Sequence, residues 1–397
     1  MGHFDPCNIP DRRGSDSVKW DRSVLKQICG NPDALPFWVA DMDFLSPPEV
    51  IEALHERVSH GVFGYIQDMS EVYELFTRWT WSRHRWPTEA AQLCITPGII
   101  SALSCLVNVF TREGDRIIIQ TPAYRPFFSV IRENRRVVAE NPLRYQAGRY
   151  TLDLDHLESL MKDPSAAMMI FCSPHNPSGR VWTRAELEEV DALAKRYHVL
   201  VISDEIHADM SYRHVRHIPY SSLSESAAPR SVTCMAPSKT FNIPGEHFSC
   251  IVIPDAGMKK RFASYLKRIS INTPTILSRV AAEAAYRHGA PWLDGLIAHL
   301  EDQSSYIDRT LSEASREILY VKPEASFIAF IDCREVEKRL NPGEDLVQVL
   351  GTKGGIALHR GSWFGRDGSG FVRLNFGTSR ALLQEGLVRF IETVRTI

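Results

Sequence analysis

The middle of the chain alternates short apolar runs with amphipathic stretches. The apolar runs are continuous and rich in β-branched residues, which is typical of strands buried on both faces. They cover residues 116–120, 167–172, 199–203, 231–235 and 250–253. This alternation of strands and helices predicts an α/β fold with a mainly parallel sheet and helices on both of its faces.

Two of the expected helices have clear starts. Thr183-Arg184-Ala185-Glu186 is a capping box, and it predicts a helix that runs to about Tyr197. A second helix is expected after Pro97-Gly98, because apolar residues then recur at helical spacing, at Ile99, Leu103, Leu106 and Val107.

The pattern changes after about residue 285. Shorter strands are expected within 322–332, 355–359 and 370–375, followed by a final helix from Ala381. We therefore predict a large domain over 46–285 and a smaller α/β domain over 286–397. The first 45 residues end in a segment punctuated by prolines and are expected to form an arm that contributes to the small domain.

Composition and charge narrow the class of protein. The 397 residues are 44% hydrophobic and 24% charged, and the formal net charge is −2, which gives no case for binding nucleic acid or an anionic membrane. No apolar stretch is long enough to span a membrane, and the first residues lack the apolar segment of a secretory signal. The eight cysteines include no C-x-x-C pair. Reduced thiols, a cytoplasmic location and no metal site are expected.

Three polar side chains follow three of the predicted strands: Asn176, Asp204 and Lys239. Ligands of such sheets bind at the carboxyl ends of the strands. A lysine can form a Schiff base with pyridoxal phosphate, an acid can face the ring nitrogen, and an amide can donate to the ring's phenolate oxygen. Taken singly, a surface lysine, a helix-capping aspartate and a turn asparagine are the alternatives. Together the three predict a pyridoxal phosphate site.

Further residues fit the same site less specifically. The backbone N–H groups of Ile99 and Ile100 open the helix after Pro97-Gly98 and can hold a phosphate, to which Ser238 can add a hydroxyl. Tyr124 follows a strand and can stack on the pyridine ring, although a core tyrosine is the alternative. His207 can reach the phenolate oxygen or serve only in packing.

Arg373 lies inside an apolar strand, where an arginine needs an anionic partner. The carboxylate of an amino-acid substrate is a natural bidentate partner, and a structural ion pair is the alternative. Arg380 is a second candidate. No G-x-G-x-x-G follows any predicted strand, which argues against a nicotinamide dehydrogenase.

Several runs carry a family resemblance, and together they span nearly the whole chain. They are 14–21, 38–44, 63–65, 172–183, 203–209, 236–242, 363–365 and 370–375. On these runs the chain resembles the fold-type I pyridoxal phosphate enzymes. Within them it is similar to the MalY/PatB family of carbon-sulfur β-lyases, which includes cystathionine β-lyases and cystalysin.

The resemblance implies a seven-stranded main sheet and a role for each candidate residue. Lys239 would be the Schiff-base lysine, with Asp204 at the ring nitrogen and Asn176 at the phenolate oxygen. Tyr124 would stack on the ring, and together with Lys239 and Asp204 it completes the expected catalytic set. The remaining assignments are phosphate binding by Ile99, Ile100 and Ser238, cofactor contact by His207, substrate carboxylate binding by Arg373, Asn176 and the Ala40 backbone, and phosphate binding across a homodimer by Tyr65.

The activity implied is α,β-elimination from an L-cysteine S-conjugate or cystathionine. An aminotransferase or a decarboxylating enzyme would use the same residues, and a regulatory protein that retains a cofactor site is a different class. One stretch departs from the family pattern: Gly245 is followed by Glu246 and His247 in place of an apolar step. These two side chains either face the surface or reshape the substrate pocket.

Overall fold

The main sheet of the computed structural model, which describes residues 4–397, has seven strands. Their order across the sheet is β2 (Leu93–Thr96), β10 (Ser249–Val252), β9 (Ser231–Met235), β8 (Leu200–Asp204), β7 (Ala166–Cys172), β3 (Arg116–Thr121) and β4 (Val137–Pro142). All neighbours pair in parallel except those of β10, which runs antiparallel to β2 and β9. The prediction of an α/β fold with a mainly parallel seven-stranded sheet is confirmed.

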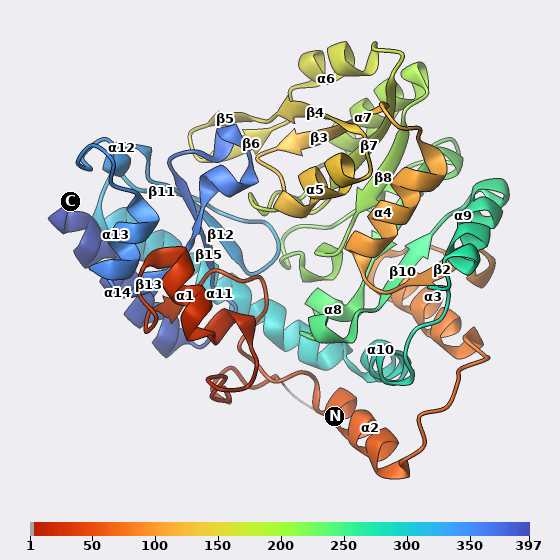
Figure 1. Ribbon diagram of the computed structural model, residues 1–397, viewed down its shortest axis with the longest axis horizontal. Coiled ribbons are helices and arrows are strands. Elements are labelled where there is room, and N and C mark those ends of the chain that lie inside the picture. Colours follow the sequence, from red (N-terminus) through yellow and green to blue (C-terminus); the bar gives the residue numbers. More distant parts are fainter. Residues whose placement is uncertain (1–3) are drawn as a thin grey trace.

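Helices cover both faces of this sheet, as the continuous apolar strands require (Figure 1). Ile117 and Ile119 of β3 pack in one apolar cluster, and Ile118 between them packs in another. The first cluster includes side chains of α4 (Ile99–Phe110), α5 (Arg125–Glu133) and α9 (Ala256–Arg268), and the second those of α6 (Leu154–Met161) and α7 (Arg184–Tyr197). Both halves of the predicted capping box at Thr183 are formed at the start of α7.

A second sheet is antiparallel and has the order β11 (Leu319–Val321), β12 (Ile328–Asp332), β15 (Phe371–Asn375) and β14 (His359–Arg360). The final helix, α14 (Arg380–Thr396), starts one residue before its predicted start. The strand expected within 322–332 covers only 328–332. Residues before it turn away, because the Glu324 N–H bonds to the Gly179 carbonyl and the Ser326 N–H to the Met210 carbonyl. The predicted domain boundaries remain predictions.

The structure contains further strands and helices beyond those described above. Sequence analysis did not predict β2, β4 or the hairpin of β5 (Arg144–Gln146) and β6 (Arg149–Thr151). The other helices are α1 (Arg22–Cys29), α2 (Pro48–His60), α3 (Ser70–His84), α8 (Pro237–Thr240), α10 (Ile276–His288), α11 (Ala290–Ala314), α12 (Arg334–Glu337) and α13 (Leu346–Thr352). No helix within the described residues has the length and apolar character needed to cross a membrane.

The N-terminal arm packs against the C-terminal part of the chain (Figure 1). Its strand β1 (Leu35–Pro36) pairs in parallel with β13 (Ile356–Ala357), and α1 lies against α13. Residues 1–3 of the predicted arm lie outside the described residues. After β1 the arm continues without helix or strand to Pro47, and it reaches the carboxyl ends of the main strands, where the Ala40 carbonyl accepts a hydrogen bond from Lys239.

Candidate active site

A pocket opens at the carboxyl ends of the parallel strands. Residues that follow β2, β3, β7, β8 and β9 meet there because these strands run in the same direction. Its lining consists of Ala40, Ile99, Ile100, Tyr124, Cys172, Asn176, Asp204, Ile206, His207 and Lys239. The structure therefore brings together eight of the predicted site residues, from five separate connections and the N-terminal arm.

Lys239 lies on α8, the single helical turn after β9. Its ammonium donates a hydrogen bond to the Ala40 carbonyl. Burial lowers the pKa of Lys239 to about 8, with Arg373 acting in the same direction and Asp41 and Asp204 opposing it. An amine with this pKa is far more readily available as a free base near neutral pH than an exposed lysine.

Asp204 ends β8 and is 3% exposed. One carboxyl oxygen accepts the Ile206 N–H at 3.2 Å, and no ion pair involving Asp204 is found within residues 4–397. Burial, together with the neighbouring Glu205, raises the pKa of Asp204 to about 7. A buried carboxylate without a cation is unfavourable, so this position suits a cationic ligand group.

The neighbouring Glu205 has a different environment. Its carboxylate accepts hydrogen bonds from the Ser203 hydroxyl at 2.8 Å and the Tyr220 N–H at 2.8 Å, and it lies 2.7 Å from Nε2 of His217. Two adjacent acids thus have separate environments: Glu205 is fully bonded within the protein, whereas Asp204 faces the pocket. Asp204 is the one left available for a ligand.

Arg373 lies on β15 of the second sheet and is 2% exposed. Its guanidinium donates to the Trp38 carbonyl at 2.9 Å, to Oδ1 of Asn176 at 3.4 Å and to Nδ1 of His359 at 2.6 Å. Its Nε–H has no acceptor, and no carboxylate in the described part of the chain pairs with it. Burial lowers the pKa of Arg373 to about 10. A buried guanidinium with only neutral partners is well suited to bind a carboxylate.

His359 was not predicted from the sequence, and it orients this guanidinium. Because arginine can only donate, Nδ1 of His359 must accept, and the ring proton then lies on Nε2. Burial and the nearby Arg373 lower the pKa of His359 well below its ordinary value, which keeps the ring neutral. The ring packs between Trp38 and Trp363, with centroid distances of 5.3 and 4.9 Å.

The start of α4 provides a place for an anionic group. Gly98 precedes the helix with φ of 87°, a conformation that disfavours side chains with a Cβ. The first backbone N–H groups of a helix have no acceptor inside the helix, and Ile99 and Ile100 line the pocket at this point. Ser238 is partly buried beside Lys239 on α8 but does not line the pocket in the described structure.

Tyr124 and His207 both line the pocket. Tyr124 caps α5, and burial raises the pKa of its hydroxyl, which therefore keeps its proton. Nδ1 of His207 lies 3.1 Å from the Ser326 hydroxyl. Burial lowers the pKa of His207 to about 3, so its ring is neutral at physiological pH.

Other candidates lie elsewhere. Arg380 does not reach the pocket, because its guanidinium pairs with Asp302 and lies over the Tyr306 ring. Glu246 and His247 do not line it either, although Nδ1 of His247 is 3.8 Å from where a Cβ on Gly98 would lie. Tyr65 is fully exposed in its own chain.

Sequence analysis missed Cys172 and Ile206 as lining residues. Both obey the rule that located Asn176 and Asp204, since Cys172 is the last residue of β7 and Ile206 follows β8 by two positions. Within residues 4–397 no group of three or more His, Cys, Asp or Glu side chains could hold a metal ion.

The residues present fit pyridoxal phosphate. The pocket combines a lysine of lowered pKa, a buried carboxyl without a cation, and open N–H groups at a helix start. These three features match an aldehyde, a protonated ring nitrogen and a phosphate, respectively.

Comparison with known proteins agrees with this arrangement. The model of the family described as Aminotransferase class I and II matches residues 32–390. Cystathionine beta-lyase PatB of Bacillus subtilis (strain 168) is 40% identical over 379 residues, which is 96% of this chain and 97% of PatB. Protein MalY of Escherichia coli (strain K12) is 34% identical, over 99% of this chain and 100% of MalY. Cystalysin from Treponema denticola, which contains pyridoxal 5'-phosphate, superposes with a TM-score of 0.93 at 32% identity and covers 99% of both chains.

Proposed function

The chain belongs to the aminotransferase class I and II family, and we propose that within this family it is a pyridoxal phosphate-dependent carbon-sulfur β-lyase. It would convert an L-cysteine S-conjugate or cystathionine, with water, into a thiol, pyruvate and ammonia. Similarity to cystathionine beta-lyase PatB over nearly the full length of both chains carries this choice. The site supports it, because the pocket holds a base in Lys239 and an acid in Asp204, and Arg373 contacts the lining residue Asn176 from outside the lining.

The chain's own residues account for binding and proton transfer. Arg373 would bind the substrate's α-carboxylate with the donor capacity that its neutral partners leave unused, which includes the Nε–H. Asn176, 3.4 Å from Arg373, would lie between the carboxylate and the ring oxygen. Lys239 Nζ would take the proton from the substrate's Cα, which its lowered pKa permits near neutral pH.

Pyridoxal phosphate, when bound, supplies an electron sink for the charge left on Cα. Asp204 would keep the ring nitrogen protonated, and the N–H groups of Ile99 and Ile100, with the Ser238 hydroxyl, would hold the phosphate. Tyr124 would cover the ring and retain its hydroxyl proton.

The proposed activity predicts pyruvate from cysteine conjugates. Purified protein with pyridoxal phosphate should release one pyruvate and one thiol for each L-cystathionine or S-alkyl-L-cysteine consumed. Pyruvate is measured with lactate dehydrogenase and thiol with a colorimetric reagent. Absence of both products from a set of conjugates with different leaving groups would reject the lyase.

Transamination is a second candidate, because the matching family is itself described as aminotransferases. It would leave the cofactor in its amine form after one half-reaction and would release no thiol. A single-turnover absorbance experiment with cystathionine and with an amino acid lacking a leaving group separates the two reactions.

We also propose that the enzyme is a homodimer in which Tyr65 reaches the phosphate of the neighbouring site. Tyr65 is fully exposed, and the nearby Val62 and Phe63 are 61% and 55% exposed. They lie in a segment without helix or strand between α2 and α3, and their exposure means that residues 4–397 of the same chain leave them largely uncovered. A run of exposed apolar side chains is typical of an interface.

Tyr65→Phe should weaken pyridoxal phosphate binding about 10-fold, because one hydrogen bond to a charged group is lost. A fluorescence titration of the protein with the cofactor measures this. Mixing Tyr65→Phe chains with Lys239→Ala chains should restore wild-type affinity and activity in one of the two sites of each mixed dimer. A monomer in sedimentation, or no recovery on mixing, would contradict the proposal.

A cytoplasmic location is part of the same proposal. Cys7 is exposed and the other seven cysteines are buried, and none is in a disulfide. Unpaired thiols in this number favour a reducing compartment.

A further inference from the structure

The segment Trp38–Phe44, called the strap below, links the two residues on which the proposed chemistry depends. The Ala40 carbonyl accepts a hydrogen bond from the Lys239 ammonium, and the Trp38 carbonyl accepts one from the Arg373 guanidinium. Lys239 lies on α8, directly after strand β9 of the main sheet, and Arg373 lies on β15 of the second sheet. The backbone of the strap therefore touches the proposed base and the proposed carboxylate receptor from one short stretch.

Two asparagines hold the inner side of the strap. Asn242, three residues after Lys239, accepts the Met42 N–H at 3.0 Å and donates to the Met42 and Phe44 carbonyls at 3.1 and 2.7 Å. Asn375, two residues after Arg373, donates to the Val39 and Asp41 carbonyls. Each functional residue is thus followed, two or three positions later in the chain, by an asparagine whose amide holds the strap.

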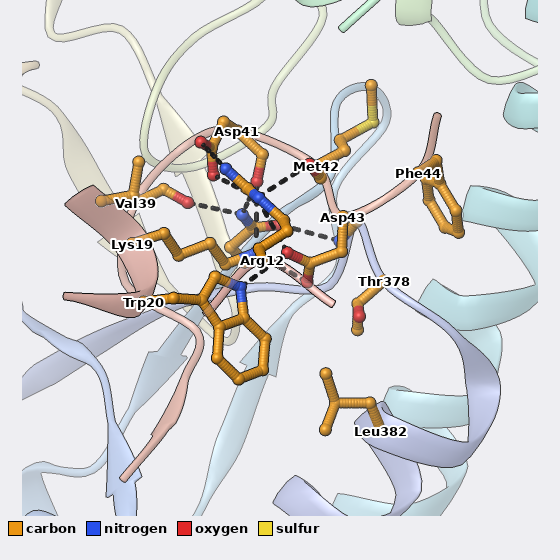
Figure 2. A network of polar contacts seen from close by, with 12 residues as sticks. Arg12, Lys19, Trp20, Val39, Asp41, Met42, Asp43, Phe44, Thr378 and Leu382 are labelled. Carbon is orange, nitrogen blue, oxygen red and sulfur yellow. Dashed lines mark hydrogen bonds and ion pairs between the residues drawn. The ribbon is translucent and has the colours of Figure 1, made fainter. Parts of the chain in front are cut away.

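Two cations of the N-terminal arm hold its outer side (Figure 2). Arg12 pairs with Asp41 at 2.6 Å and with Asp43 at 2.9 Å, and it also donates to the Met42 carbonyl at 3.1 Å. Lys19 pairs with Asp43 at 2.8 Å, and the Trp20 indole donates to the same carboxylate at 3.2 Å. The two cations balance the two carboxylates.

The Lys19–Asp43 and Arg12–Asp41 ion pairs differ in burial. The side chains of Lys19 and Asp43 are each 1% exposed, so this pair belongs to the packed interior. Although burial alone would raise the pKa of Asp43, Lys19 and Arg12 hold it below its ordinary value. Arg12 and Asp41 are 18% and 16% exposed. Altering this pair leaves Asp41 in a partly solvated place, and Asp43, which Arg12 also contacts, keeps Lys19 as its cation.

Asp41 also acts on Lys239 through its charge, since it directly follows Ala40 in the chain. The charged groups that influence the Lys239 pKa are Asp41 on the strap, Asp204 after β8 and Arg373 on β15. His207 also lines the pocket, and the charge of Lys239 helps to lower its pKa, so its ring stays neutral. Asp41 is the only one of these three charged groups whose charge is paired with another side chain, and that partner is Arg12.

We propose that the Arg12–Asp41 ion pair is a positioning device, which fixes both the strap carbonyls and the charge that face Lys239 and Arg373. Arg12 and Asp41 touch neither substrate nor cofactor in this proposal, and they act through Ala40 and Trp38. The inference rests on the proposed function only in taking Lys239 as the residue that holds pyridoxal phosphate. It does not depend on whether the reaction is elimination or transamination.

Opposite substitutions test the proposal. The quantity to measure is the pH midpoint of the visible absorption band of the cofactor-loaded enzyme, which reports protonation at the Lys239 nitrogen. Arg12→Gln leaves the Asp41 charge uncompensated, so the protonated form is favoured and the midpoint should rise by about 0.5 to 1 pH unit. Asp41→Asn removes the negative charge, and the midpoint should fall by a similar amount. Both variants loosen the strap at Arg373, and kcat/KM should fall about 10- to 100-fold, mainly through KM.

Arg22→Gln is the matched control, because Arg22 pairs with Asp33 on the same arm and both side chains are exposed. This variant should keep the wild-type midpoint and KM. Thermal unfolding of each loaded variant establishes that it is folded. Midpoints that stay unchanged, or that move in the same direction in Arg12→Gln and Asp41→Asn, would overturn the proposal. Since the band forms without any substrate, this result is independent of whether pyruvate is released.

Discussion

Lys239→Ala should lower the turnover of a cysteine S-conjugate by at least about 10³-fold and abolish the cofactor's reducible visible band. Both effects follow from the loss of Lys239, the one lysine among the described residues that line the pocket, which we propose as the covalent attachment point and as the base for the Cα proton. Initial rates of pyruvate release and absorbance before and after borohydride measure them.

The fold should survive this change. Among the described residues, the Lys239 ammonium bonds to the Ala40 carbonyl alone, and burial already disfavours its charge. The variant without cofactor should therefore unfold at a temperature close to that of the wild type. Lys195→Ala, which removes an exposed lysine of α7, is the matched control and should keep full activity. A Lys239→Ala protein that still forms the band and turns over would invalidate the site.

Asp204→Asn should have opposite effects on activity and on stability. Activity should fall about 10²- to 10³-fold, because the ring nitrogen loses its fixed negative partner. The protein without cofactor should become more stable at pH 8, on the order of 2 kcal/mol, because a buried carboxylate without a cation is removed. Removing a buried charge that serves the cofactor is expected to exchange function for stability.

The size of this stability gain depends on pH in a defined way. The folded-state pKa of Asp204 is raised to about 7 from an ordinary 3.8. The folded state thus prefers the protonated acid, and stability is lost as pH rises from about 4 to about 7. The stability gain of Asp204→Asn should vanish below pH 4, where both side chains are neutral. Denaturant unfolding across this range measures it, with the exposed Asp155→Asn as a control. A gain that is independent of pH would contradict the assigned environment of Asp204.

The five inner strands of the main sheet and the three polar residues that line the pocket after them could be predicted from local patterns. The strands at 116–121, 166–172 and 200–204 are continuous apolar runs because both faces are covered, so the hydrophobic pattern alone marks them. Parallel strands place their carboxyl ends together, and that rule located Asn176, Asp204 and Lys239. The strand β2 was missed, because Leu93–Thr96 is short and begins directly after a polar turn.

The sequence also predicted that Arg373 would need an anion, and the structure leaves it without one. The alternative of a structural ion pair is not realised in the described residues, whereas Arg380 does pair with Asp302. The two arginines lie on consecutive elements, and only their surroundings separate them. The local sequence indicates that an arginine in an apolar strand needs polar partners, but it does not identify the groups that surround the arginine in the folded chain.

By itself, the sequence determined the α/β class, the positions of the five inner strands of the main sheet along the chain and the polar residues that follow three of them. These depend on patterns within a few residues of one another. Only the tertiary structure decided what sets the environment of those residues. Lys239 bonds to a carbonyl 199 positions away, and Arg373 to one 335 positions away. Burial by distant segments, rather than residue type, moves the pKa of Lys239 to about 8 and that of Asp204 to about 7. Desolvation and long-range backbone contacts leave no periodic pattern in the chain, and they exist only once it has folded.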